Sequence, residues 1–210
     1  MEVPDFDPVS TMGDISLSSY KGKWIVYFSH PNDFSPICTT EIIGFAKADT
    51  YFKKINTELI GISVDSLNSH LAWLYDIYLK TGLIVNFPII ADQNGVIARK
   101  YGMISNDVSS TETVRNIFII DDKGIIRSIF VYPMNIGRYI PEILRTVTAL
   151  QYSDQNNCMT PANWSPGNPM IVPPPKTFNA LRERNESINK NRNGMCWYLS
   201  FKNPETQKLE

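Results

Sequence analysis

The sequence is poor in cysteine and histidine, with three cysteines and two histidines among its 210 residues. Three cysteines are an odd number and too few to crosslink a small secreted fold, so a disulfide scaffold is excluded. The same five residues show none of the paired spacings that hold a structural zinc ion. Any disulfide in this chain is therefore expected to be transient and catalytic.

An excess of either charge is also missing, because 20 basic and 21 acidic residues leave a formal net charge of -1. No overall positive field would draw nucleic acid or an anionic membrane surface to the protein, so neither is an expected partner. No apolar run approaches the roughly 18 residues of a transmembrane helix. The opening residues 1–7 lack the basic and apolar regions of a secretory signal, which predicts a soluble, cytoplasmic protein.

Hydrophobic residues make up 43% of the chain, enough for a substantial core, and the length suits one domain with an appendage. Short apolar runs predict buried strands at 24–29, 59–64, 116–120 and 125–132. Helical spacing predicts helices at 39–54, 68–80, 95–101 and 138–151. A turn signal at 121–124 joins the last two strands into a hairpin. The pattern predicts an α/β domain over residues 1–151, with a mixed sheet flanked by helices on both faces.

The composition changes after residue 151. Prolines cluster between residues 160 and 175, where they remove backbone donors and favour an extended chain. A polar helix is expected at 178–189 and a strand at 195–201. Residues 152–210 can hardly form an independent core, so we expect an extended C-terminal arm or small subdomain that packs on the main domain or on a partner subunit.

The most informative segment is Ser29-His-Pro-Asn-Asp-Phe-Ser-Pro-Ile-Cys-Thr-Thr-Glu41. It places Cys38 after a buried strand and at the start of a helix, where free N–H groups and the helix dipole favour a thiolate. Ser35 is near enough in sequence for its hydroxyl to reach the sulfur or a bound oxygen. Pro31 stiffens the loop and can shield the sulfur from water. The alternative is that Cys38 is a small buried hydrophobic residue.

The two histidines carry weaker expectations. His30, at the end of a predicted strand, is either a base or a structural hydrogen-bond donor, and His70 is expected at the surface. A thiol–disulfide oxidoreductase of the thioredoxin type needs Cys-x-x-Cys, whereas Thr39, Thr40 and Glu41 follow the cysteine here. That activity is therefore disfavoured.

Several segments together resemble one known family. Pro31-x-x-x-Ser35-x-x-Cys38, followed by Thr-Thr-Glu, resembles the signature of the peroxiredoxins, and Thr113-Val-Arg-Asn-Ile-Phe-Ile-Ile-Asp121 resembles the strand that carries their active-site arginine. The resemblance to the long, one-cysteine subfamily extends it over nearly the whole chain. That part is carried by Tyr132-Pro133, Gly137-Arg138, Glu142-Ile-Leu-Arg145 and Thr160-Pro-Ala-Asn-Trp164.

The resemblance implies a thioredoxin-like fold and a thiol-dependent peroxidase. Such an enzyme reduces hydrogen peroxide and organic hydroperoxides through a sulfenic acid on Cys38, with no metal or organic cofactor. Arg115 would be the guanidinium partner of the thiolate, and Pro31 and Ser35 would complete the pocket, where most relatives have threonine in place of the serine. Glu41 and Arg138 would form an ion pair that orients Arg115, unless that pair is only a helix-end salt bridge.

Other implied features stay open at this point. His30 matches a histidine beside the pocket. Cys196 is a candidate resolving thiol, Cys158 is better interpreted as a buried hydrophobic residue, and an external thiol such as thioredoxin or glutathione is the other option. The resemblance implies a homodimer or a ring of dimers.

Two further activities compete with the peroxidase. A redox-sensing or chaperone-like oligomer is the alternative function, and it can coexist with peroxide reduction. The lipase activity credited to some relatives needs Gly-x-Ser-x-Gly, but the corresponding region reads Ser19-Tyr-Lys-Gly-Lys-Trp24. We therefore predict no hydrolysis of phospholipids.

Overall fold

The structure is a computed structural model that describes residues 6–104, 107 and 111–203. Its strands are β1 (Val9–Ser10), β2 (Gly13–Asp14), β3 (Trp24–Ser29), β4 (Thr57–Ser63), β5 (Ile89–Ala91), β6 (Arg115–Ile120), β7 (Ile126–Tyr132), β8 (Met170–Ile171), β9 (Gly194–Cys196) and β10 (Leu199–Lys202). Its helices are η1 (Leu17–Tyr20, 3-10), α1 (Pro36–Lys54), α2 (Leu67–Thr81), α3 (Val96–Lys100), α4 (Ile140–Asn156) and α5 (Phe178–Asn191). The chain divides into two compact units, Met1–Ile140 and Pro141–Glu210. The expected boundary after residue 151 and the expected packing on a partner subunit stay predictions.

The first unit contains a mixed sheet of seven strands in the order β2-β1-β5-β4-β3-β6-β7. β3, β4 and β5 are parallel, whereas β6 is antiparallel to β3 and β7 is antiparallel to β6. The predicted hairpin is present: the Gly124 N–H donates to the Asp121 carbonyl at the turn between β6 and β7. The predicted mixed sheet flanked by helices is confirmed.

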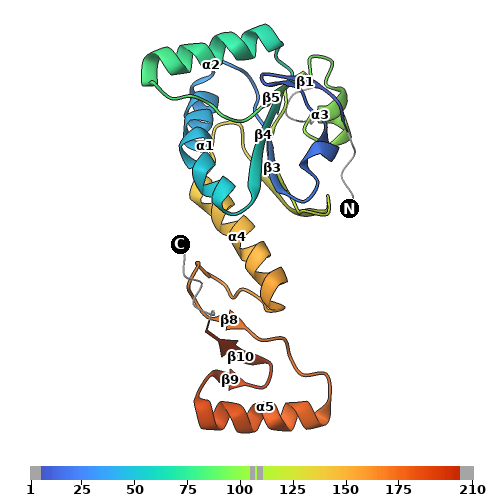
Figure 1. The fold of residues 1–210 in the computed structure, drawn as a ribbon, viewed down its shortest axis with the longest axis vertical. Helices are drawn as coiled ribbons and strands as arrows, with labels where there is room; N and C mark the ends of the chain where they lie inside the picture. Colours follow the sequence, from blue (N-terminus) through green and yellow to red (C-terminus); the bar gives the residue numbers. More distant parts are fainter. Residues whose placement is uncertain (1–5, 105–106, 108–110, 204–210) are drawn as a thin grey trace. The chain divides into compact units, whose positions relative to one another are not determined.

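Helices cover both faces of this sheet. In Figure 1, α1 and α2 lie on one side and α3 lies on the other. Connections between parallel neighbouring strands are almost always right-handed, and the strand order steps the same way from β3 to β4 and from β4 to β5. The two crossover helices, α1 and α2, therefore fall on the same face.

The central position of β3 in the sheet explains why its sequence is apolar throughout and does not alternate with polar residues. Successive side chains of a strand point to opposite faces. Tyr27 packs edge-on against Tyr101 on the α3 side, with ring centroids 5.0 Å apart. Phe28 points to the α1 side, where it stacks on Phe45 at 4.1 Å. All six residues of β3 are buried, so this strand forms the centre of the core.

The described elements differ from the predicted ones mainly at their ends. α1 begins at Pro36 instead of residue 39, because proline suits the first helical turn, where its missing N–H would have no partner. α4 begins at Ile140, so Arg138 precedes the helix that was expected to contain it. β1, β2, β5 and β8 were missed, because runs of two or three residues give no period to detect.

The second unit contains a small three-stranded sheet in the order β8-β10-β9, together with α4 and α5. The single strand expected at 195–201 is wrong. Leu199 pairs with Cys196 in antiparallel register, so Trp197 and Tyr198 form the turn of a hairpin. A continuous apolar run does not reveal such a tight turn in the absence of glycine, asparagine or proline.

None of the helices in the described part of the chain is long and apolar enough to cross a membrane.

Candidate active site around Cys38

Cys38 lies in the first turn of α1, as its sequence position predicts. Ser35 is the N-cap residue, but its hydroxyl makes no capping hydrogen bond with the helix. The Ser35 Oγ atom is buried and has no hydrogen-bond partner among the described residues. Cys38 itself is fully buried, and Pro31 is buried as well. Helix geometry leaves the backbone N–H of Cys38 without an intrahelical acceptor, so it adds a donor beside the thiol.

Arg115 reaches the cysteine from the first position of β6. Phe118 and Ile120 of this strand belong to the cluster on the α3 side of the sheet. Alternation therefore directs Arg115 to the opposite face, where α1 lies. Its Nη1 atom donates to Cys38 Sγ at 3.4 Å, and its Nε atom donates to the Met134 carbonyl at 2.9 Å. These contacts fix the guanidinium against the sulfur.

Glu41 and Arg138 complete a buried ion network behind this contact. Glu41 lies three residues after Cys38, so both side chains occupy the same face of α1. Its Oε2 atom accepts from Arg115 at 2.9 Å and from Arg138 at 2.6 Å, and its Oε1 atom accepts from the Arg138 backbone N–H at 2.9 Å. Arg138 also donates to the backbone carbonyls of Ser29 and Asn116. The predicted Glu41–Arg138 ion pair is therefore present, and it includes Arg115.

The charges of this network do not cancel. Two guanidinium groups face one carboxylate, and all three side chains are at most 7% exposed. Burial lowers the pKa of Arg138 to about 10, against the opposing attraction of Glu41, so it still carries its charge at neutral pH. The network has one uncompensated positive charge, which is costly in a buried site. A thiolate at Cys38 would neutralise it.

We expect Glu41→Gln to lower the free energy of unfolding by about 3–5 kcal/mol, because it removes the carboxylate charge that two buried guanidinium groups share. Urea unfolding followed by circular dichroism measures the change. Glu142→Gln is the matched control, since Glu142 pairs with Arg145 at the surface, where an ion pair contributes at most about 1 kcal/mol. Equal losses in the two variants would contradict the assignment of a buried network.

A second buried cluster consists of His30 and Asp33, which precede Cys38 in the sequence, and the distant His70. His30 Nε2 is 3.0 Å from Asp33 Oδ1, and His70 Nδ1 is 2.8 Å from Asp33 Oδ2. The prediction that His70 is at the surface is wrong, because its side chain is fully buried. His70, Trp73 and Ile77 form the inward face of α2 at helical spacing.

Asp33 was missed by the sequence reasoning, together with its link to His70. The two residues are 37 positions apart, and no motif connects them. The i, i+3, i+7 period of His70, Trp73 and Ile77 was a signal that His70 faces inward. The carboxylate partner becomes apparent only when α2 packs over the loop that follows β3.

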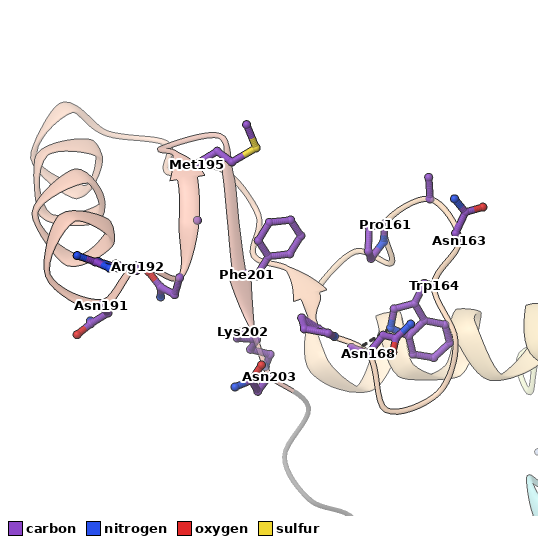
Figure 2. A pocket seen from close by; sticks show the side chains of 14 residues that line it. Pro161, Asn163, Trp164, Asn168, Asn191, Arg192, Met195, Phe201, Lys202 and Asn203 are labelled. Carbon is purple, nitrogen blue, oxygen red and sulfur yellow. Dashed lines mark hydrogen bonds between the residues drawn. The ribbon is translucent and has the colours of Figure 1, made fainter.

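The other cysteines lie in the second unit. Cys158 is 5% exposed, whereas Cys196 in β9 is partly exposed, and neither forms a disulfide. A hydrogen bond with Cys196 raises the pKa of Tyr198. The second unit also contains a hollow of about 850 Å³, shown in Figure 2, whose lining includes Trp164 and Phe201 but none of the three cysteines. The Trp164 indole N–H donates to the Asn168 carbonyl at this wall.

Sequence comparison relates the chain to known proteins over nearly its whole length. Residues 1–129 match the AhpC/TSA family, and residues 149–187 match the C-terminal domain of 1-Cys peroxiredoxin. The chain is 52% identical over 199 residues to a peroxiredoxin 2 of Caldanaerobacter subterraneus subsp. tengcongensis, covering 95% of this chain and 90% of that protein. It is 43% identical over 214 residues to a peroxiredoxin of Methanosarcina mazei, covering 99% and 97%.

Two solved structures are similar over the same extent. A yeast mitochondrial 1-Cys peroxiredoxin, studied for its thiol resolving mechanism via glutathione/thioredoxin systems, has a TM-score of 0.84 at 39% identity, covering 97% of each chain. A mutant of the peroxiredoxin 6 of Arenicola marina has a TM-score of 0.84 at 31% identity, covering 99% of this chain and 98% of that one.

Proposed function

Because the chain belongs to the peroxiredoxin family, in the type with a 1-Cys C-terminal domain, we propose that Cys38 is the thiol that attacks peroxide. As a peroxiredoxin the protein is a thiol peroxidase that reduces peroxides. The observation that carries the proposal is the 3.4 Å contact between Arg115 Nη1 and Cys38 Sγ, inside a buried network with one excess positive charge.

The reaction follows from these groups. The Cys38 thiolate attacks one oxygen of hydrogen peroxide or an organic hydroperoxide, a sulfur–oxygen bond forms and the oxygen–oxygen bond breaks. The leaving hydroxide or alkoxide takes up a proton as water or alcohol, and Cys38 becomes a sulfenic acid. Negative charge moves from the sulfur onto both oxygens in the transition state. Preorganised donors at that place stabilise the transition state more than the ground state.

Three donors are assigned to these oxygens. Arg115 already contacts the sulfur, and the Cys38 backbone N–H lies at the free end of the helix. The Ser35 hydroxyl is buried without a partner, which suits a group that bonds to a bound peroxide. Pro31 is buried, and we assign it to the wall of the peroxide pocket. Glu41 and Arg138 are positioning residues for Arg115. Since Cys38 is fully buried, a movement of the surrounding residues must admit the peroxide.

The sulfenic acid must then be reduced by a thiol. We assign this step to an external reductant such as thioredoxin or glutathione, in line with the glutathione/thioredoxin systems of the yeast relative. Cys196 is the second candidate, because it is a partly exposed free thiol, whereas Cys158 is buried. A thiol-dependent cycle suits a reducing, cytoplasmic compartment. A homodimer, or a ring of dimers, is the oligomeric state we expect.

One equivalent of peroxide should add a single oxygen to Cys38. A 1,3-diketone traps the resulting sulfenic acid, and peptide mass spectrometry identifies the modified residue. Glutathione added in place of the trap should form a mixed disulfide on Cys38 while Cys196 stays free. The Cys196→Ser variant is the matched control and should give the same products. A Cys38–Cys196 disulfide would refute the external reductant, and oxidation at another residue would refute the role of Cys38.

A further inference from the structure

We propose that Asp33 and His70 are positioning residues that hold His30 in one tautomer, so that its Nδ1 atom accepts the proton of the reducing thiol. The inference rests on the proposed function, since it concerns the reduction of the Cys38 sulfenic acid. The cluster of His30, Asp33 and His70 has no part in the attack on peroxide, and this inference gives it a role in the later reduction.

The hydrogen bonds determine where the protons of the cluster lie. His70 faces an acceptor with each ring nitrogen: Nδ1 faces the Asp33 carboxylate at 2.8 Å, and Nε2 faces the Ile90 carbonyl at 3.3 Å. Because neither acceptor can donate, both nitrogens of His70 carry protons, and the ring is an imidazolium paired with Asp33. The positive charge of His70 alone thus balances the negative charge of Asp33.

His30 is then left neutral, with its proton on Nε2. That nitrogen donates to Asp33 Oδ1 at 3.0 Å. Its Nδ1 atom is buried and has no hydrogen-bond partner among the described residues, so it presents a bare lone pair. Burial lowers the pKa of His30 despite the attraction of Asp33, which agrees with a neutral ring.

The ionised state of Asp33 is also supported. Burial would raise the pKa of this carboxyl, but hydrogen bonds from His30 and His70 outweigh burial and keep it well below its ordinary value. The titratable groups that face His30 are Asp33, His70 and Asp65. Asp65 is engaged elsewhere, because its Oδ2 atom accepts from the Asp33 backbone N–H and from Ser63.

The His30 ring is connected to the helix that carries Cys38. Its centroid lies 5.2 Å from that of Trp73, and the Trp73 indole N–H donates to Thr39 Oγ1, one residue after Cys38. Other groups around the thiol are unsuited to accept a proton. Arg115 and Arg138 are cations, and both oxygens of Glu41 already accept hydrogen bonds from them. The Nδ1 lone pair of His30 is the uncommitted base.

The proton balance identifies the step that needs this base. When a thiol attacks the sulfenic acid, a sulfur–sulfur bond forms, the sulfur–oxygen bond breaks, and the products are a disulfide and water. The thiol proton moves to His30 Nδ1 and from there to the departing hydroxide. The earlier attack on peroxide starts from a thiolate and needs no such acceptor. Loss of the tautomer should therefore slow reduction and spare oxidation.

Asp33→Asn tests this directly. An asparagine offers one acceptor and one donor, so it can pair with Nε2 of His30 in the opposite tautomer. We expect the rate constant for glutathione attack on the sulfenic acid to fall about 100-fold, a typical contribution of general acid–base catalysis. The single-turnover rate of oxidation by hydrogen peroxide should change less than about threefold. His70→Gln should weaken reduction in the same direction.

Two further measurements separate positioning from folding. In wild type, the nitrogen-15 shifts of His30 should show Nε2 protonated and Nδ1 bare, and Asp33→Asn should shift them toward the other tautomer. Asp92→Asn is the matched control, because Asp92 is a buried carboxylate that bonds to backbone N–H groups at the start of α3. It should leave the rate of reduction and the His30 shifts unchanged.

Several outcomes would overturn the inference while leaving the role of Cys38 intact. They are an equal loss of oxidation and reduction in Asp33→Asn, a His30 protonated at Nδ1 in wild type, and a stoichiometric metal ion held by the two histidines and Asp33. Absence of any oxidation at Cys38 would instead refute the proposed function itself.

Discussion

Peroxide consumption should fall to the background of the assay when Cys38 is replaced by serine. Removal of the nucleophile that forms a covalent intermediate costs a factor on the order of 10⁶ in other enzymes. A serine hydroxyl stays protonated at neutral pH, so it neither neutralises the network of Arg115, Glu41 and Arg138 nor attacks the peroxide oxygen. The measurement is the single-turnover reaction of reduced protein with one equivalent of hydrogen peroxide.

The matched control for this variant is Cys196→Ser, which removes a partly exposed thiol from the second unit. Its single-turnover rate should equal that of wild type, because the first step involves only the attacking sulfur. Circular dichroism should show that both variants are folded. A Cys38→Ser variant that still consumes one equivalent of peroxide would contradict the assignment.

The second large effect is expected from Arg115→Lys. The substitution keeps a positive charge but removes the planar fork with which Arg115 contacts Cys38, Glu41 and the Met134 carbonyl. Loss of one preorganised donor to the transition state costs about 100- to 1000-fold in rate. We expect a loss of that size in the rate constant for oxidation by hydrogen peroxide, measured by stopped flow.

Arg127→Lys provides the control for the chemistry of the substitution. Arg127 is in β7, where it pairs with Asp121 and lies over the Trp24 ring, away from the thiol. Its replacement should leave the rate of oxidation within about twofold. If Arg115→Lys also left the rate of oxidation within about twofold, the proposed role of the Arg115 guanidinium in the attack on peroxide would be wrong.

The fold was largely predictable where the sequence contains long periodic elements. β3, β6 and β7 are within one residue of their predicted ends. β3 and β6 are buried along their whole length, as their continuous apolar runs predict. The prediction that 125–132 is a buried strand is wrong, because β7 is the edge strand of the sheet and is only partly buried. β1, β2, β5 and β8 are only two or three residues long and were missed. The sequence of the β9–β10 hairpin resembles one continuous strand, because Trp197 and Tyr198 at its turn are strand-forming residues.

In the candidate site, too, local features could be predicted from the sequence and long-range contacts could not. Ser35 and Cys38 are close in sequence, so the start of α1 and the position of the thiol followed from local rules. Arg115 is 77 residues from the cysteine, and only the resemblance to a family connected the two. His70 and Asp33 form a contact that depends on packing of α2, which the sequence does not encode in any spacing.

The proposed function requires Cys38 to react as a thiolate, the charge that would balance the excess guanidinium group of its network. The ultraviolet absorbance of thiolates measures the ionisation of Cys38 at neutral pH. We expect reduced wild type to contain one thiolate per chain more than Cys38→Ser, and this absorbance to disappear with one equivalent of peroxide. Identical absorbance in the two proteins would contradict it.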